Sequence, residues 1–457
     1  MISSKAKKNC LFMIFLTLLI GLFIFLILTI PGNKSFIENK NAQTASIIDT
    51  IEGQEKKLKL RQLKNFGLET KQGFISQKID FLEVHLQEMK ARIYKQGILE
   101  KEISILAKGD PLFWGGVPSG LYKVISGYKN AFSNIAQVYM PWSINFYGKY
   151  YIHGEPYYPN GKKSNFDYTG GCIRFSDEDA EYIYNTTEIE MPVLIIDKEN
   201  DGYKYNSWNN KTMPEISAES YLIADLDNYY ILAEKNPEKI MPIASLTKLM
   251  TALVVIENND LRKSIWVNEG MLKAYGSTPG LEAGQKYNLV ELLHPLLIQS
   301  SNDAAEILTY FRGREKTLRL MNEKTKIIGM ENTFYDDPSG LSEKNVSTAK
   351  DLFYLGNYIF NTRPPLFKIS KGEIIETFAS VRFQDLHNKN IFPESQDFLG
   401  GKTGFILESR YTGMFIFELP LPDNTSHNII IILLKSENLK DDVQKILTWW
   451  FEENYLE

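Results

Sequence analysis

The sequence predicts a multidomain protein with an N-terminal transmembrane helix, an all-β domain and then a larger α/β (α+β) domain. The length of 457 residues, at about 150 per domain, suggests roughly three structural units. One uncharged apolar run is long enough to cross a bilayer, and strand-like alternation comes after it. The second half of the chain combines helical apolar spacing with one continuous apolar strand, a combination that favours a mixed sheet-and-helix domain.

The composition excludes several classes of protein. Hydrophobic residues make up 44% of the chain and charged residues 23%, which argues against global disorder, collagen and a bundle of many membrane helices. Lysine and arginine number 51 against 56 acids, so there is no basic excess and we expect no nucleic acid partner. Only two cysteines occur, Cys10 and Cys172, which excludes a disulfide scaffold.

The apolar run covers residues 11–30, which as a helix would span roughly 30 Å. The residues before it include Lys5, Lys7 and Lys8 and no acid, so the positive-inside rule keeps the N-terminus in the cytoplasm. We therefore expect an uncleaved, single-pass anchor. A cleaved signal peptide is the alternative, but the run exceeds a usual signal core and no A-x-A-like site follows it.

Changes in composition divide the chain into six segments. Residues after the anchor are rich in Lys, Glu, Gln and Asn, which is typical of a solvated stalk. A later stretch with Asn, Lys, Gly and Pro predicts a linker. The predicted order is a cytoplasmic tail (1–9), a transmembrane anchor (10–31), a stalk (32–77), a first folded domain (78–198), a linker (199–216) and a second folded domain (217–457).

Strand patterns fill the first domain. Apolar residues alternate over residues 79–106, and Gln96-Gly97 separates two of the runs, as in a β-hairpin. Further short strands are expected at 120–125 and 143–147, with a closing strand at 193–196. These patterns predict a small all-β domain.

Cys172 follows two glycines and lies nineteen positions after His153. A cysteine attacks an amide as thiolate, so it needs a base beside it and amide donors for the developing oxyanion. Glycines before the thiol let backbone N–H groups approach that oxyanion. The spacing alone leaves the ordinary interpretation open, in which the cysteine is a small buried hydrophobe and the histidine a satisfied polar residue.

The local motif resembles the L,D-transpeptidase (YkuD-type) family. The similar features are His-Gly at 153–154, the run Thr-Gly-Gly-Cys-Ile-Arg at 169–174, Asp179-Ala180 and Tyr184. The resemblance covers residues 78–198. It implies a cysteine enzyme that cleaves the L-centre to D-alanine bond of a peptidoglycan tetrapeptide stem and passes the acyl group to an amine or water.

The resemblance also implies roles for individual residues. Cys172 would be the nucleophile and His153 the base, while Thr169, Gly170 and Gly171 would shape the oxyanion pocket. Arg174 would hold a substrate carboxylate or, equally, form a structural ion pair. Family members commonly carry histidine where this chain has Gly170, so an inactive wall-binding domain stays open as an alternative.

A hairpin at 221–226 and 230–233 opens the second domain, and helix-forming residues follow Pro242. On that helix Ser245 and Lys248 stand at i and i+3 and share a face. A desolvated lysine with a lowered pKa can remove the proton of a serine hydroxyl. Taken alone, S-x-x-K is a weak signal, because such pairs arise by chance on many helices.

Two further motifs follow in order, Ser300-Ser301-Asn302 and Lys402-Thr403-Gly404. The set S-x-x-K, S-x-N and K-T-G is that of serine penicillin-recognising enzymes. Together with residues 281–284 and 337–341, it resembles the D-alanyl-D-alanine carboxypeptidase family of low-molecular-weight penicillin-binding proteins. The resemblance covers about residues 215–450.

By this resemblance Ser245 is acylated by the D-Ala-D-Ala carbonyl and Lys248 accepts its proton. Ser300 and Asn302 would relay protons and position the peptide. Lys402 and Thr403, which Gly404 follows, would bind the terminal carboxylate. The backbone amides of Ser245 and Phe405 would bind the oxyanion.

The C-terminal part supports an α/β sandwich. Residues 429–434 form an apolar run typical of a buried central strand, and Val443, Ile446, Leu447 and Trp450 then lie on one face of a helix. We expect this helix to pack on its own sheet, with an amphipathic membrane contact as the alternative.

The function expected from the sequence is a membrane-anchored, bifunctional peptidoglycan-remodelling enzyme. Its partners would be peptidoglycan stem peptides, with β-lactams as inhibitors, and the membrane through the N-terminal helix. It would be a single-pass protein of the bacterial cytoplasmic membrane with extracytoplasmic catalytic domains. The five histidines form no H-x-x-x-H cluster, so no metal and no cofactor are expected. A serine D,D-endopeptidase and a β-lactamase, each with an inactive wall-binding first domain, are the alternatives.

Overall fold

The computed structural model describes residues 63, 65–164, 169–198, 205, 212–276, 280–375, 383, 385–421 and 423–455. The predicted cytoplasmic tail and anchor lie outside these residues, as do most of the predicted stalk and linker. Within the part that is described, no helix is both long enough and apolar enough to span a membrane. The two domains belong to one compact unit that begins at residue 62.

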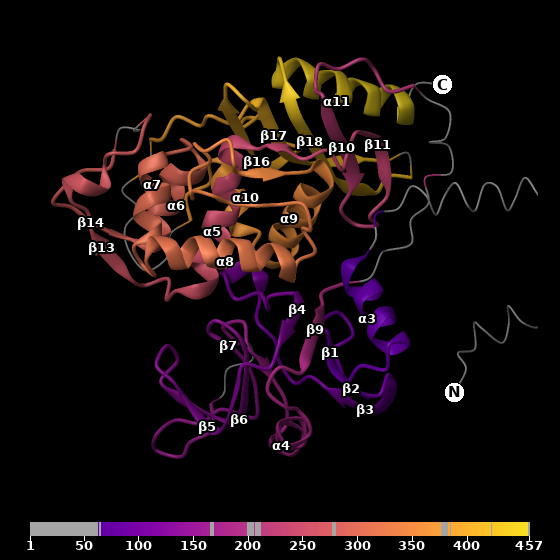
Figure 1. Ribbon diagram of the computed structural model, residues 1–457, viewed down its shortest axis with the longest axis vertical. Coiled ribbons are helices and arrows are strands. Elements are labelled where there is room, and N and C mark those ends of the chain that lie inside the picture. The colour runs from indigo at the N-terminus through magenta and orange to yellow at the C-terminus, as the bar shows by residue number, and fades with distance from the viewer. Residues whose placement is uncertain are drawn as a thin grey trace, which may run out of the picture. The chain divides into compact units, whose positions relative to one another are not determined.

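The first domain contains a five-stranded and a four-stranded sheet (Figure 1). The five-stranded sheet has the order β3 (Ile98–Ser104), β2 (Lys90–Lys95), β1 (Phe81–His85), β9 (Pro192–Ile196) and β4 (Gly120–Lys123). The four-stranded sheet has the order β5 (Ser126–Ser133), β6 (Val138–Tyr147), β7 (Tyr150–His153) and β8 (Ile173–Arg174). These strands confirm the predicted strand regions. The hairpin turn at Gln96-Gly97 has positive φ at both residues, 51° and 73°, as a type I′ turn requires.

The prediction of an all-β first domain is wrong in one respect, because the domain also carries helices. Helix α4 (Asp177–Thr186) follows β8, and its start is fixed by Ser176, whose side chain accepts a hydrogen bond from the Asp179 amide. Three acidic residues in its first turn match the positive end of the helix dipole. The domain is therefore β-rich.

Helix α3 (Phe66–Ser76) lies within the predicted stalk. Asn65 caps its N-terminus by accepting a hydrogen bond from the Leu68 amide. Leu68 and Phe74 pack against a cluster around the buried Phe81. Apolar burial thus attaches residues 66–76 to the first domain, where composition alone predicted solvated chain.

The second domain is built on an antiparallel five-stranded sheet. Its order is β11 (Ile231–Lys235), β10 (Ser220–Asp225), β18 (Ser426–Ser436), β17 (Arg410–Pro420) and β16 (Phe398–Ile406). The apolar run at 429–434 is fully buried in β18, the middle strand, which confirms that prediction.

Helices cover both faces of this sheet (Figure 1). One face carries α11 (Leu439–Tyr455), in which Val443, Ile446 and Trp450 are buried, so the predicted packing of this helix on its own sheet is confirmed. The other helices are α5 (Thr247–Asn258), α6 (Leu289–Leu297), α7 (Asn302–Thr309), α8 (Arg314–Ile327), α9 (Ala349–Thr362) and α10 (Pro365–Lys371). Short elements complete the described chain: η1 (Pro111–Phe113), β12 (Met241–Pro242), η3 (Ala244–Leu246), β13 (Ser264–Trp266), η4 (Glu269–Met271), β14 (Lys286–Asn288) and β15 (Val346–Ser347).

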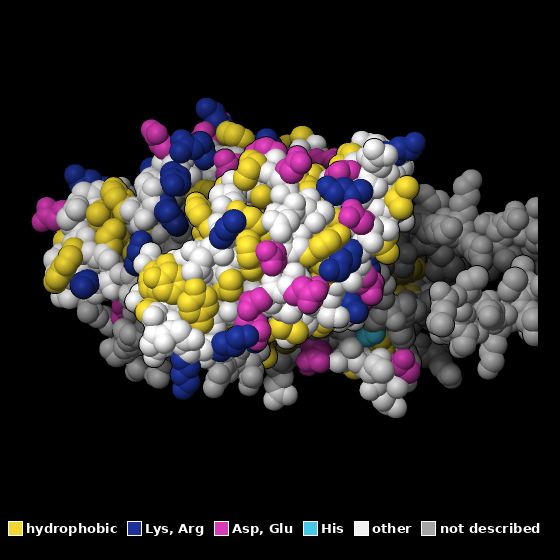
Figure 2. All heavy atoms as spheres, turned by 90° about the horizontal axis from the view of Figure 1, so that it is seen from below, with side chains coloured by type: hydrophobic (Ala, Val, Ile, Leu, Met, Phe, Trp, Pro, Cys, Tyr) yellow, Lys and Arg dark blue, Asp and Glu magenta, His cyan; other side chains and the backbone are white. Residues whose placement is uncertain are grey.

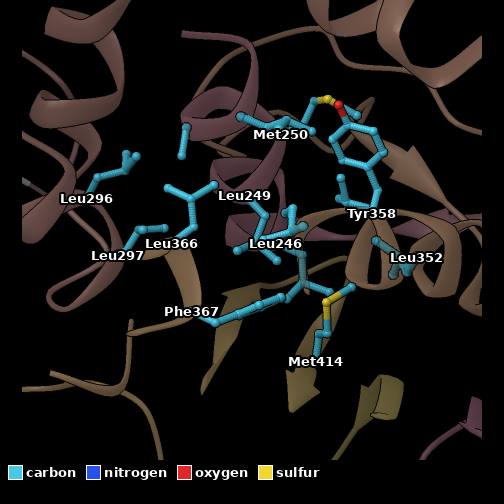
Figure 3. Close-up of a cluster of buried hydrophobic side chains, with 14 of the residues drawn as sticks. Leu246, Leu249, Met250, Leu296, Leu297, Leu352, Tyr358, Leu366, Phe367 and Met414 are labelled. Carbon is cyan, nitrogen blue, oxygen red and sulfur yellow. The ribbon is translucent and has the colours of Figure 1, made fainter. Parts of the chain in front are cut away.

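Helix α5 is the centre of the second domain, since every one of its residues is buried. Figure 3 shows Leu246, Leu249 and Met250 among side chains from the surrounding elements. Those neighbours are Leu296 and Leu297 of α6, Leu352 and Tyr358 of α9, Leu366 and Phe367 of α10, and Met414 of β17. A helix buried on all sides is held rigidly, which suits it to position catalytic groups.

Lys, Arg, Asp and Glu side chains are interspersed on the face drawn in Figure 2. Among the described residues on that face no large area carries charge of one sign, in keeping with the net charge of −5.

Two candidate active sites

Ser245 lies in the 3-10 turn η3, which runs directly into α5, and Lys248 is in the first turn of that helix. Lys248 Nζ is 2.9 Å from Ser245 Oγ. Ala244, just before the serine, has a left-handed φ of 46°, a strained backbone of the kind that collects at functional sites. The structure therefore brings the S-x-x-K pair together at the buried start of α5.

The surroundings of Lys248 favour a neutral amine that can act as a base. Burial lowers the pKa of Lys248 to about 7; nearby Asp337 raises it and the charge of Lys389 lowers it further. The amine also lies 2.7 Å from Asn302 Oδ1 and contacts the carbonyl oxygen of Ser339. These two oxygens can only accept, so they take the two N–H groups of a neutral amine and leave its lone pair for the Ser245 hydroxyl.

The S-x-N motif lies between α6 and α7. Its middle residue, Ser301, caps α7 by accepting a hydrogen bond of 3.1 Å from the Ala304 amide. Ser300 has a left-handed φ of 59°, and both Ser300 and Asn302 line the same cleft as Ser245. The side-chain amide of Asn302 donates to the Tyr275 carbonyl at 2.6 Å, which fixes its oxygen toward Lys248.

The K-T-G motif forms part of β16. Lys402 is buried and donates to the Thr403 carbonyl at 2.7 Å; burial and the charges of Lys248 and Lys389 hold its pKa well below the usual value. A side chain at Gly404 would place its Cβ 2.7 Å from the Ser245 amide nitrogen. The strand backbone therefore runs close beside the Ser245 amide, where the oxyanion donors are expected.

A cleft of about 960 Å³ joins the three motifs, although the buried Lys248 and Lys402 are not among its lining residues. The predicted residues that line it are Ser245, Ser300, Asn302, Thr403, Gly404 and Phe405. Sequence reasoning missed Lys389, which comes from the segment before β16 and has no motif to mark it. It also assigned no role to Ser339, although the Asp-Pro-Ser-Gly-Leu run was a usable signal. Asp337 accepts hydrogen bonds of 2.6 Å from the amides of Ser339 and Gly340 and so shapes this turn.

The cysteine site lies where β7 and β8 pair in parallel. Ile152 is opposite Ile173 and His153 is opposite Arg174, so Cys172 comes directly before β8. A pocket of about 170 Å³ holds both reactive side chains. The predicted residues among its walls are Cys172, His153, Thr169, Gly170 and Arg174, and Lys149 is an addition that sequence reasoning missed.

The surroundings of this pocket favour the neutral forms of both the thiol and the imidazole. Burial raises the pKa of Cys172 to about 11, opposed by a hydrogen bond from the Tyr151 backbone and by the charge of Lys149. Burial lowers the pKa of His153 to about 4, and Arg174 lowers it further. His153 Nδ1 lies 2.6 Å from the Gly154 carbonyl, which can only accept, so Nδ1 carries the proton and Nε2 is the basic nitrogen.

The two glycines before Cys172 differ in how much space surrounds them. Gly171 has φ of 107°, and a Cβ there would lie 2.4 Å from the Tyr150 ring. Gly170 has no heavy atom within 4 Å of an added Cβ, so a side chain fits at this position. Thr169 ties the loop together, because its hydroxyl donates to the Cys172 carbonyl and accepts from the Gly171 amide at 3.3 Å.

One group of side chains in the described residues could approach a metal ion, formed by Asp225, Asp227 and His427. His427 forms a hydrogen bond with Asp225, and Lys198 forms a salt bridge of 3.1 Å with Asp227. These contacts satisfy the carboxylates within the protein, and the group lines neither candidate site.

Comparisons with known families divide the chain in the same way. The family described as "L,D-transpeptidase catalytic domain" (YkuD) matches residues 79–195. The family described as "D-alanyl-D-alanine carboxypeptidase" (Peptidase_S11) matches residues 207–413. Both resemblances given by the sequence motifs are thereby confirmed.

Several relatives are similar to part of this chain. The D-alanyl-D-alanine endopeptidase of Haemophilus influenzae is 35% identical over 208 residues, 44% of this chain and 70% of that protein. The D-alanyl-D-alanine carboxypeptidase DacB2 of Mycobacterium tuberculosis is 29% identical over 206 residues, again 44% and 70%. A crystal structure of a D-alanyl-D-alanine carboxypeptidase from the same organism is 25% identical and covers 57% of this chain and 98% of its own, with a TM-score of 0.47.

Proposed function

Because the chain belongs to the D-alanyl-D-alanine carboxypeptidase family, peptidase S11, we propose that its second domain is a serine D,D-carboxypeptidase that removes the terminal D-alanine of peptidoglycan pentapeptide stems. The observation that carries this proposal is the Ser245–Lys248 pair, in which the amine is also bonded to Asn302 and Ser339. That arrangement places a base, the Lys248 amine, beside a nucleophile, the Ser245 hydroxyl, which lines the cleft.

The proposed serine reaction has two steps. Lys248 takes the hydroxyl proton while Ser245 Oγ attacks the carbonyl between the two D-alanines, and the amides of Ser245 and Phe405 hold the oxyanion. The proton passes to the leaving D-alanine as the C–N bond breaks. Water then hydrolyses the ester. Lys402 and Thr403 would hold the terminal carboxylate, and the bound carboxylate would favour a charged Lys402.

The first domain, we propose, is a cysteine L,D-transpeptidase that acts on tetrapeptide stems. His153 Nε2 takes the thiol proton, and the Cys172 sulfur attacks the carbonyl that precedes the terminal D-alanine. D-alanine leaves with that proton, and a stem amine or water receives the acyl group from the thioester. The loop of Thr169, Gly170 and Gly171 would present amides to the oxyanion.

The two activities fit in sequence. Removal of the last D-alanine from a pentapeptide yields the tetrapeptide that an L,D-transpeptidase needs as donor. The serine domain would therefore supply its neighbour with substrate.

The test gives pentapeptide muropeptides to the purified protein and compares wild type with Ser245→Ala and Cys172→Ala. Wild type should form tetrapeptide and then L,D-cross-linked or hydrolysed products. Ser245→Ala should leave the pentapeptide intact, and Cys172→Ala should accumulate tetrapeptide. Pentapeptide loss at wild-type rate in Ser245→Ala contradicts the serine role, and unchanged later products in Cys172→Ala contradict the cysteine role.

A D,D-endopeptidase is the second candidate for the serine domain, because the Haemophilus influenzae relative carries that name. Dimeric D,D-cross-linked muropeptides separate the two activities: faster cleavage of dimers than of pentapeptide favours the endopeptidase. Rapid turnover of penicillin would instead favour a β-lactamase. A Cys172 thiol that takes no acyl group while the protein still binds cell walls would favour a wall-binding first domain.

Membrane anchoring through residues 10–31, with both domains outside the cytoplasmic membrane, is proposed from the charge-free run and the lysines before it. The protein should sediment with membranes after an alkaline wash, and protease added to spheroplasts should degrade both domains. A protein that is released by the wash, or protected from protease, contradicts this placement.

A further inference from the structure

Lys149 joins the cysteine pocket to the neighbouring domain. It lies at the turn between β6 and β7 and forms part of the wall of the pocket that holds Cys172 and His153. Its amine donates hydrogen bonds to the carbonyl oxygens of Ile256, at 3.0 Å, and Asn259, at 2.7 Å. Those carbonyls are at the carboxyl end of α5, the helix whose first turn holds Lys248.

The end of a helix is a strong site for a cation. The last carbonyls of α5 have no partner within the helix, and the helix dipole makes them negative. A lysine bound there is held in one position, in contrast to a lysine that moves freely in solvent. The second domain therefore fixes the position of a positively charged residue that lines the pocket of the Cys172 thiol.

The Cys172 thiol, which is half-buried, would gain from such a charge. The partial burial of Cys172 raises its pKa and so opposes formation of the thiolate, and its base His153 is buried. Proton transfer between them creates a thiolate in a small pocket that is partly shielded from solvent, where a nearby cation has a larger effect than in water.

We propose that Lys149 is a positioning residue of the cysteine site: a positive charge, fixed by the carboxyl end of α5, that stabilises the Cys172 thiolate. The proposal deepens the proposed L,D-transpeptidase function, because it names the group that makes the nucleophile available. The cysteine site would be complete only with the serine domain in place.

The pKa of Lys149 depends on its burial and on the charges of four neighbouring groups. Burial lowers the pKa of Lys149 to about 8, and the charge of Arg363, after α9, lowers it further. Glu257 of α5, Asp260 after α5 and the Cys172 thiolate raise it. Around the thiol itself, Arg174 and His153 line the pocket and Tyr150 and Tyr151 adjoin it. With its pKa lowered to about 8, Lys149 is the group whose loss of charge the pH dependence of thiol reactivity should show.

The ordinary alternative is that Lys149 only caps α5. A cap affects stability but leaves the acidity of the thiol unchanged. The pH dependence of thiol reactivity therefore separates the two roles.

The test measures alkylation of Cys172 by iodoacetamide between pH 6.5 and 10, by intact mass, in the full-length protein with Cys10→Ser. In this reaction the thiolate sulfur forms a bond to carbon and iodide leaves with the electron pair. The wild-type rate should rise tenfold per pH unit up to about pH 8 and then flatten as Lys149 loses its proton. Lys149→Met should react about tenfold more slowly at pH 7, rise with constant slope, and meet the wild-type curve at high pH.

Lys149→Arg retains the charge and does not titrate in this range, so it should react fast and without the flattening near pH 8. Lys162→Met, which removes an exposed lysine from the same domain, should match wild type. Penicillin labelling of Ser245 shows that each variant is folded.

Superimposable curves for wild type and Lys149→Met overturn the proposal, and so does flattening near pH 8 in Lys149→Arg. A failure of the proposed L,D-transpeptidase function would give a different result. In that case the pH profiles differ as expected, but Cys172 forms no acyl-enzyme with tetrapeptide stems.

Discussion

Lys248 can act as a base only while its amine is neutral. Because burial lowers its pKa to about 7, the neutral fraction rises as pH increases from 5.5 to 8.5. Acylation of Ser245 by a fluorescent penicillin should therefore speed up through about pH 7 and level off above pH 8. A matched Lys248→Arg variant, whose side chain stays charged, should lose at least about 100-fold in rate.

Stopped-flow fluorescence would measure these rates. A rate that is independent of pH over this range, or an active Lys248→Arg protein, contradicts the assignment of Lys248 as the base.

The adjacent glycines before Cys172 provide a second test at the residue scale. Gly171→Ala places a methyl group against the Tyr150 ring at a left-handed φ, so we expect a loss of about 2 kcal/mol or more in unfolding free energy. Gly170→Ala enters open space and should change that free energy by no more than about 0.5 kcal/mol. Urea denaturation measures both, and equal losses would contradict the difference in steric surroundings between the two glycines.

Gly170→His restores the side chain common in the family without a steric conflict at its Cβ.

Motifs made some residues of the sites predictable, and the absence of motifs hid others. Ser245, Lys248 and Asn302 were found because they stand at fixed offsets in an ordered set. Lys389 and Lys149 were missed because each reaches its site from a turn or loop, where side-chain direction depends on tertiary packing. No sequence pattern encodes that direction.

Helix α8 carries a lysine, Lys324, that contacts both domains. Lys324 is fully buried, pairs with Glu257 of α5 at 2.8 Å, and donates to the hydroxyls of Tyr358 and, from the first domain, Tyr122. Lys324→Met would leave part of the Glu257 charge uncompensated in the interior, so it should cost about 3–5 kcal/mol of unfolding free energy.

Lys326→Met, two residues further along α8 and exposed, is the matched control and should be nearly neutral. Guanidinium denaturation compares the two variants. A small effect of Lys324→Met would show that the buried contact contributes little to stability.

Strands with a strong apolar pattern were predictable: β1 lies in a stretch of alternating apolar residues, and β18 contains a continuous apolar run. Short elements were harder: β8 has two residues, and its parallel partner β7 is distant in sequence. The helix α4 did carry a start signal, Ser176 followed by three acids, but its short length gives little periodicity to support it.

For the whole molecule, the sequence predicted two catalytic domains joined by a linker, but not their contact. Arg363 of the second domain donates to Tyr150 at 2.9 Å and to the Gly116 carbonyl at 2.6 Å. These partners are more than 200 residues apart, and no local pattern connects them. Buried charges shared between domains are a property of the assembled fold.

Intact-mass labelling would show whether this one chain carries two separate acylation sites, at Ser245 and at Cys172. Penicillin should add once to Cys172→Ala, at Ser245, and a carbapenem should add once to Ser245→Ala, at Cys172. The double variant should take neither. A penicillin adduct that survives in Ser245→Ala, or a Cys172 thiol that takes no carbapenem in that variant, would contradict the account.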